Sequence, residues 1–258
     1  MGLIEIIRNI VSGGKKVDVK KLPSQGYFYP NDFEIKLKKA SEEDIIDYEF
    51  NYNKENILEV IESVKKIVLT NTIFSDGYKF EDLKSVDIVF LFLEIVKYTT
   101  NRNVNIEFFN DDLGRGDSIP FDYKNFQYFN LEKFREFYDE VDCSFLVDGY
   151  QFAMPSVGVE NSLTHYLFSV SNQSDSDKYN DYSYDFLFFL GRKNNLTFSE
   201  IENLITIFNF DIDDGEKKRI KSIIKKFIEI IEYNLKVNNN LVDVKSRLDL
   251  ENIWKVES

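Results

Sequence analysis

The chain has 258 residues, and 45 Asp and Glu against 32 Lys and Arg give a formal net charge of −13. A chain of this length can bury a sizeable core, and 43% hydrophobic residues exclude a wholly disordered protein. The negative net charge repels phosphate backbones and anionic lipid headgroups, so we expect no nucleic-acid and no membrane partner.

Cys143 is the only cysteine and His165 the only histidine. One cysteine cannot form an intramolecular disulfide, and the two residues cannot build a closed zinc site of the usual type. They could in principle pair as nucleophile and base, but no Gly-x-Ser-x-Gly elbow surrounds any of the nearby serines. We therefore expect no catalytic residue, no cofactor and no metal site.

Residues 3–11 place Leu3, Ile7 and Ile10 on one helical stripe, and Gly13-Gly14 ends the predicted helix. So short a helix is marginal in water, so it requires a surface to pack on. That surface is either its own domain or a neighbouring subunit. We assign residues 1–14 to an N-terminal arm.

The next part of the chain alternates apolar and polar residues over 17–22 and 33–37, which predicts two short strands. An acidic helix start follows Ser41. Two longer helices are predicted over 57–68 and 81–99. The second is apolar nearly all round, so we expect it at the centre of the fold.

Strands are predicted over 103–109 and 143–154, and Asp148-Gly149 is typical of a two-residue hairpin turn. The remaining helices are predicted over 161–170, 184–190, 199–208 and 215–236.

These elements predict an α+β fold, mainly helical with a small antiparallel sheet built from the four predicted strand segments. We expect residues 15–236 to form a single module, with residues 110–125 as the candidate sub-boundary. A mobile acidic loop is expected over 171–183, and residues 237–258 are expected to be a linker and loosely held tail.

Two further segments are candidate partner surfaces. Tyr27, Phe28 and Tyr29 follow one another in a proline-bounded loop, which either offers rigid contact area to a partner or packs on its own domain. Basic residues crowd the start of the last long helix, where the helix dipole disfavours cations. They either meet an acidic surface or form a solvated face; the candidates are Lys217, Lys218, Arg219 and Lys221.

A family resemblance rests on two stretches. Leu22-Pro23-Ser24-Gln25-Gly26-Tyr27-Phe28-Tyr29-Pro30, followed by a strand and an acidic helix start, resembles the opening of T-even-type bacteriophage baseplate proteins. In that family a Leu-Pro-Ser-x-Gly-x-x-Tyr-Pro loop stands at this place. Asp148-Gly149-Tyr150-Gln151-Phe152-Ala153-Met154-Pro155-Ser156 is similar to the later hairpin of the family.

The resemblance implies a structural or assembly protein of a contractile phage tail. Such a protein is a baseplate hub component that contacts other tail proteins in a hetero-oligomeric symmetric assembly, is put together in the host cytoplasm, and is located in the virion. Alternatives are a transient assembly chaperone absent from the virion, or a small cytoplasmic phage enzyme or host-takeover factor. Some family members carry paired cysteines of a zinc-ribbon type, but Cys143 is alone, so no zinc role carries over.

Overall fold

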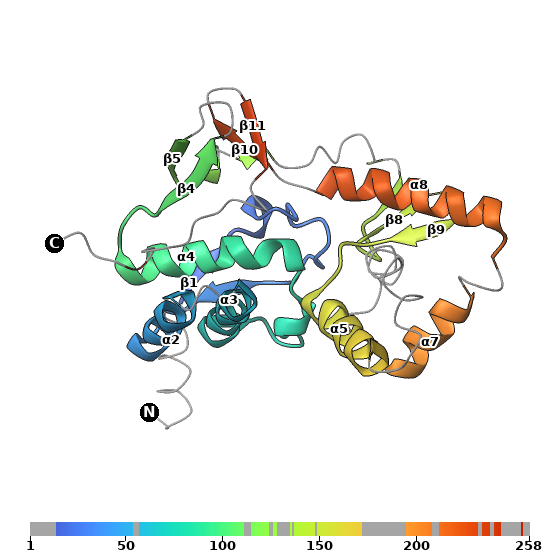
Figure 1. The fold of residues 1–258 in the computed structure, drawn as a ribbon, viewed down its shortest axis with the longest axis horizontal. Coiled ribbons are helices and arrows are strands. Elements are labelled where there is room, and N and C mark those ends of the chain that lie inside the picture. The colour runs from blue at the N-terminus through green and yellow to red at the C-terminus, as the bar shows by residue number, and fades with distance from the viewer. Residues whose placement is uncertain are drawn as a thin grey trace.

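The structure is a computed structural model that describes residues 14–53, 57–110, 115–123, 126–127, 135, 137–147, 149–171, 195–207, 212–231, 234–237, 240–243 and 254. These residues form a mainly helical α+β fold, as predicted. Figure 1 shows two groups of elements side by side, one around α4 (Ile88–Thr100) and one around α5 (Val157–Ser171) and α8 (Asp214–Ile231). Each group encloses a hydrophobic core of its own.

The first core is built by three helices and a three-stranded antiparallel sheet of order β1-β2-β3. In the sheet, Ile35 lies opposite both Val17 and Phe74. The elements are β1 (Lys15–Val17), β2 (Ile35–Leu37), α2 (Glu42–Asn53), α3 (Ile57–Asn71), β3 (Thr72–Phe74) and α4 (Ile88–Thr100).

The helix α4 lies at the centre of the first core, which confirms the sequence prediction. Its residues from Phe90 to Val96 are all buried. The helix begins at Ile88 rather than at residue 81, because residues 80–87 form other local structure and contact the second group of elements. Residues 80–87 form two 3-10 turns, and within them the backbone N–H of Ser85 donates to the Pro155 carbonyl.

The predicted strand over 17–22 is wrong beyond its first residue. β1 ends at Val17, and a 3-10 helix follows over Val19–Lys21. The Asp18 side chain accepts a hydrogen bond from the backbone N–H of Lys20 at 3.2 Å. A short polar side chain that bonds its own backbone in this way competes with strand pairing.

The second core is built by a small sheet and three helices. The sheet has the order β7-β8-β9, and the predicted hairpin is confirmed by the pairing of Val147 with Tyr150. Ser156 Oγ accepts the backbone N–H of Val159, so the helix that follows begins earlier than predicted. The elements are β7 (Tyr138–Asp139), β8 (Ser144–Val147), β9 (Tyr150–Phe152), α5 (Val157–Ser171), α7 (Phe198–Thr206) and α8 (Asp214–Ile231).

The predicted strands do not form one sheet. The pair β4 (Asn105–Asn110) and β5 (Arg115–Pro120) stands by itself. A further sheet of order β11-β10-β6 contains β6 (Phe126–Gln127), β10 (Asn234–Val237) and β11 (Asn240–Asp243). Among the described strands, every strand except β6 pairs with a strand next to it in sequence, and β6 pairs with β10.

The expectation of a linker and loosely held tail over 237–258 is wrong where the structure describes it. β10 and β11 form a hairpin, and Leu235 lies opposite Phe126. Trp254 is buried in the first core. The pairing of β10 with β6 and the ring contacts of Trp254 join residues more than a hundred positions apart, so the local sequence carries no sign of them.

Three predictions fall on residues outside the described ranges: the N-terminal arm with Leu3, Ile7 and Ile10, the acidic loop after residue 171, and the helix over 184–190.

The loop over residues 22–30 contributes to both cores, and substitutions of Tyr27 and Phe28 test which of these two side chains stabilises the fold. Phe28 is buried in the second core with its ring 5.5 Å from that of Phe145, whereas Tyr27 is 36% exposed. We expect Phe28→Ala to lower the free energy of unfolding by about 3–5 kcal/mol and the control Tyr27→Ala by about 1 kcal/mol. Urea denaturation followed by circular dichroism measures both; equal losses would contradict the assignment.

Candidate functional site

The two stretches that carry the family resemblance meet in the folded protein. The loop over residues 22–30 and the segment after β9 both pack against the 3-10 turns before α4. Val157 donates its backbone N–H to the Leu83 carbonyl, and Lys84 forms an isolated bridge with Ser156. We call this meeting point the junction, and it is formed by Ser24, Tyr29, Lys84, Asp87 and Ser156.

Asp87 is the centre of the junction and is completely buried. Its Oδ1 accepts the backbone N–H of Ser24 at 2.8 Å, and its Oδ2 accepts the hydroxyl of Tyr29 at 2.7 Å. Burial raises the pKa of this carboxyl to about 6, although both hydrogen bonds and the charge of Lys84 act in the opposite direction. The carboxylate is therefore stabilised by its partners but remains costly to bury.

Lys84 supplies the opposite charge. Its backbone N–H donates to the Tyr29 hydroxyl at 2.9 Å, and its ammonium lies 5.9 Å from the centre of the Tyr29 ring. Burial lowers the pKa of Lys84 to about 8, with Asp87 opposing the shift. The Tyr29 hydroxyl thus donates to Asp87 and accepts from Lys84. It therefore connects the loop to the 3-10 turns before α4.

The turn in the loop depends on glycine. Gln25 and Gly26 have consecutive positive φ angles of 53° and 76°. Glycine adopts this conformation without steric cost, which allows the chain to reverse between Ser24 and Tyr29. The reversal places Phe28 in the second core and Tyr29 in the first.

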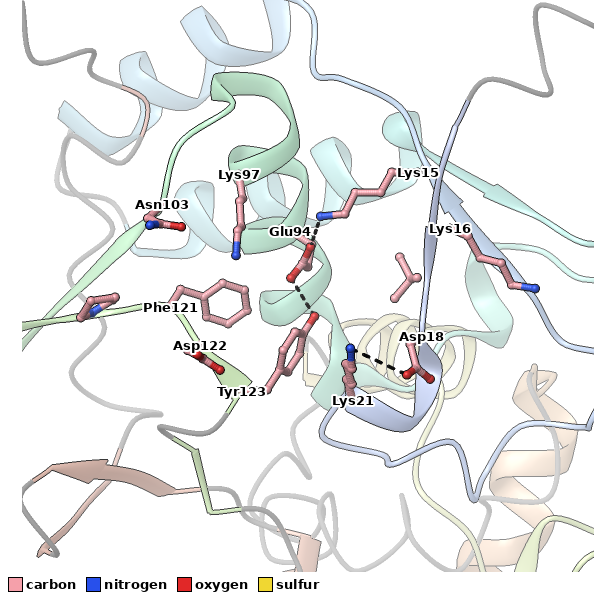
Figure 2. Close-up of a pocket in the computed structure, with 12 residues that line it drawn as sticks. Lys15, Lys16, Asp18, Lys21, Glu94, Lys97, Asn103, Phe121, Asp122 and Tyr123 are labelled. Carbon is pink, nitrogen blue, oxygen red and sulfur yellow. Dashed lines mark hydrogen bonds and ion pairs between the residues drawn. The ribbon is translucent and has the colours of Figure 1, made fainter.

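A cavity of about 440 Å³ lies beside α4, between β1 and the segment after β5. Figure 2 shows the Glu94 carboxylate at its centre, held by Lys15 and by the hydroxyl of Tyr123. The two distances are 2.6 and 2.9 Å. Glu94 is the one charged residue in the apolar stretch 88–96, a signal in the sequence that we did not use.

The ionic groups around this cavity are largely balanced. Lys21 lies 4.0 Å from Asp18, and Lys16 pairs with Glu34 while pointing away from the cavity in Figure 2. The aromatic side chain of Phe121 forms part of the wall. The contacts around Glu94 tie β1 and the segment after β5 to the central helix, which is a structural role.

The prediction that Tyr27, Phe28 and Tyr29 form a partner surface is wrong for Phe28 and Tyr29. Phe28 and Tyr29 are buried, because each fills one of the two cores. Tyr27 lies at the surface, edge-on to the ring of Tyr138 at 5.5 Å, and its carbonyl accepts the Tyr138 hydroxyl. Only Tyr27 remains available to a partner.

The predicted basic patch lies at the start of α8. Asp213 caps this helix by accepting the backbone N–H groups of Gly215 and Glu216. Lys217 lies 3.8 Å from Asp214 and Arg219 lies 3.9 Å from Glu216. Lys218 and Lys221 are exposed. Local acidic residues therefore offset part of the positive charge.

Cys143 and His165 show no catalytic arrangement in the described residues. Cys143 lies in the turn between β7 and β8 with a positive φ of 49°, and its thiol donates to the Glu140 carbonyl at 3.7 Å. Burial raises the pKa of this thiol, which disfavours the nucleophilic thiolate. His165 is exposed on α5.

Large apolar side chains are exposed on the outer faces of α2 and α3, which the sequence analysis did not single out. They are Ile46 and Phe50 on α2 and Leu58, Ile61 and Leu69 on α3. Their signal in the sequence is an apolar residue outside the buried stripe of each helix. Exposed apolar residues of this kind are typical of protein interfaces.

A scan against family models, a search of curated proteins and a search of solved structures each found no match to this chain. In the described part of the chain, His, Cys, Asp and Glu residues form no group of three or more that could hold a metal ion. No described helix combines the length and apolar character needed to cross a membrane.

Asp87 should make stability depend on pH in an unusual direction. Its pKa of about 6 in the folded protein lies above the value of about 3.9 in an unfolded chain, so the folded state binds the proton first as the pH falls. The contribution of Asp87 to the free energy of unfolding should therefore rise by roughly 1 kcal/mol between pH 7 and pH 5.

Urea denaturation at the two pH values, compared between the parent and Asp87→Asn, measures this contribution. On acidification, the free energy of unfolding of the parent should rise by that amount relative to the free energy of unfolding of Asp87→Asn. The exposed Asp76→Asn is the matched control and should keep the pH dependence of the parent. An identical pH dependence of the parent and Asp87→Asn would rule out the titration of this residue in the junction.

Proposed function

We propose that this protein is a structural or assembly component of a contractile bacteriophage tail, acting in the baseplate hub through protein–protein contacts. Its partners are then other tail and baseplate proteins, and its place is the virion. The proposal starts from the resemblance of residues 22–30 and 148–156 to the baseplate family.

The observation that carries the proposal is the junction. The two resembling stretches are separated by more than a hundred residues, yet both pack against the segment over residues 83–87. Segments that share one buried hydrogen-bond network depend on each other for their positions. Their contact therefore supports treating the two stretches as one feature of the resemblance. Asp87 and Lys84 are both buried in this network, which favours a structural role over a catalytic one.

The surface also supports a binding function. Exposed apolar residues on α2 and α3, the ring of Tyr27 and the basic start of α8 are three chemically different surfaces on one body. A subunit of a symmetric assembly contacts several neighbours and requires several such surfaces. Aromatic and apolar side chains at the surface are the residues that carry most binding energy in interfaces.

The alternative is a transient assembly chaperone that leaves before the virion is complete. Mass spectrometry of purified virions separates the two: a baseplate component is present in a fixed number per particle, and a chaperone is absent. Neighbouring genes for tail-tube, hub or wedge proteins would support either tail function. Their absence, together with absence from virions, would favour a cytoplasmic phage enzyme or host-takeover factor instead.

Two changes test the predicted partner surfaces. Deletion of residues 1–12 removes Leu3, Ile7 and Ile10, and Tyr27→Ala removes the exposed ring. Interface anchors cost more than about 2 kcal/mol on truncation, so each change should lower recovery of tail proteins in a pull-down from infected cells by at least roughly tenfold. Phe168→Ala, at an exposed aromatic residue on α5, is the control. Undiminished recovery would move the search to Lys217, Lys218, Arg219 and Lys221.

A separate pair of variants tests the absence of catalysis. His165→Ala and Cys143→Ser should leave phage yield within about twofold of the parent, because neither side chain lies in a catalytic arrangement in the described structure. Single-burst titres measure this, with circular dichroism to verify folding. A large loss of yield in a folded variant would refute the non-enzymatic interpretation.

A further inference from the structure

The cavity beside α4 holds more cationic groups than its one buried carboxylate can neutralise. Its volume of about 440 Å³ lies within the range of about 300–1,000 Å³ that is typical of small-molecule sites. Among the acidic residues that line it, only Glu94 is buried. Lys15, Lys21 and Lys97 bring three ammonium groups to the same cavity, from β1, from the 3-10 helix after it and from α4 (Figure 2).

The three ammonium groups differ in how far their charge is compensated. Lys15 lies 2.6 Å from Glu94 and is paired. Lys21 lies 4.0 Å from Asp18, and both side chains are more than half exposed, so this pair is weak. The ammonium of Lys97 forms no ion pair and no hydrogen bond with a described residue, although Lys97 is partly buried in the last turn of α4. Lys97 therefore places an uncompensated positive charge in the cavity wall.

Glu94 does not compensate Lys97, because both of its oxygens are directed to other groups. Oε2 accepts from the Lys15 ammonium and Oε1 accepts from the Tyr123 hydroxyl at 2.9 Å. Asn103 lies next to Lys97 in Figure 2, and its side-chain amide forms no hydrogen bond with a described residue. An ammonium and an amide together offer N–H donors that suit an oxyanion, and such charge-assisted hydrogen bonds are the stronger ones.

Apolar surface lies beside these donors. Pro120 and Phe121 line the cavity, and the Phe121 ring packs 5.6 Å from Phe90 and 5.4 Å from Tyr123. These contacts fix the ring in place before any ligand arrives, which lowers the cost of binding. A wall of this kind favours an anion with an apolar body over an inorganic ion.

The rim of the cavity limits the charge of the ligand. Asp18 and Asp122 line the cavity and are exposed. Their negative charges oppose an anion that carries several charges, such as a nucleotide, more than they oppose a single carboxylate. The charges of the cavity therefore favour a monoanion.

We propose that the cavity beside α4 binds a small organic monocarboxylate, with its carboxylate held by Lys97 and Asn103 and its apolar body against Pro120 and Phe121. Glu94 is then the residue that positions Lys15 and sets the charge of the site. This inference goes beyond the proposed function and does not rest on it.

The test titrates the purified full-length protein with benzoate and with hexanoate and follows binding by saturation-transfer NMR on the ligand. We expect dissociation constants on the order of 1 mM, as suits ligands of this size. Benzamide has the same ring without the charge and should bind at least tenfold more weakly. Acetate and sulfate, which lack an apolar body, should compete with benzoate at least tenfold more weakly than hexanoate does.

Variants of Lys97 locate the site. Lys97→Met removes the ammonium and should weaken benzoate binding at least tenfold, whereas Lys97→Arg keeps the charge and should bind within about threefold of the parent. Lys38→Met is the matched control, because it removes the same charge from an exposed lysine outside the cavity, and it should bind as the parent does. Circular dichroism verifies that each variant is folded.

Glu94→Gln separates a ligand site from a purely structural ion pair. This variant keeps the shape of the side chain but removes the negative charge beside the ammonium groups, so it should bind benzoate about fivefold more tightly. Its thermal midpoint should be lower than that of the parent without ligand and should rise more on addition of benzoate. The variants of Lys97 decide the matter if Glu94→Gln does not fold.

Four outcomes would overturn the proposal. They are absence of binding by both benzoate and hexanoate, equal binding by benzamide, equal competition by acetate and sulfate, which would indicate an adventitious ion only, and undiminished binding by Lys97→Met. The assay contains only purified protein and small acids. Its failure leaves the proposed role in the baseplate unchanged, and absence of the protein from virions leaves the carboxylate site unchanged.

Discussion

Asp87 accepts hydrogen bonds from the backbone of Ser24 and from the hydroxyl of Tyr29, and all three residues are buried. An ionised carboxylate is among the most expensive groups to remove from water, so its partners must stay in place. This requirement holds the loop over residues 22–30 against the beginning of α4. The positions of both hydrophobic cores depend on that attachment, because the same loop inserts one aromatic ring into each.

Two neighbouring aromatic residues therefore have separate structural roles. Tyr29 stacks on Phe33 with ring centroids 4.2 Å apart and belongs to the first core, whereas Phe28 packs against Phe145 in the second. The loop is thus a connector between two halves of the molecule rather than a projecting surface. A connector of this kind holds the two groups of elements in a fixed relation to each other.

Several charged groups of the described structure lie beside an opposite charge, although the overall net charge is −13. Glu94 is held by Lys15 and Tyr123 beside the central helix, and Asp214 and Glu216 lie near cations on α8. The contacts of Glu94 join neighbouring elements, whereas the two pairs on α8 lie within one helix at the surface and contribute little to stability. The exposed apolar residues on the outer faces of α2 and α3 are the stronger candidates for contact with other molecules.

The sequence by itself determined the fold class, the central position of α4, the hairpin around Gly149 and most of the helices, because periodicity, caps and turn residues act within a few positions. Only the tertiary structure decided that Phe28 and Tyr29 are buried, that Asp87 and Lys84 meet Tyr29, that β10 pairs with β6, and that Trp254 packs beside Tyr48. Each of these contacts joins distant residues whose local sequence is compatible with exposure. Burial is a property of what the folded chain places opposite a side chain, and the residue's sequence neighbours do not specify it.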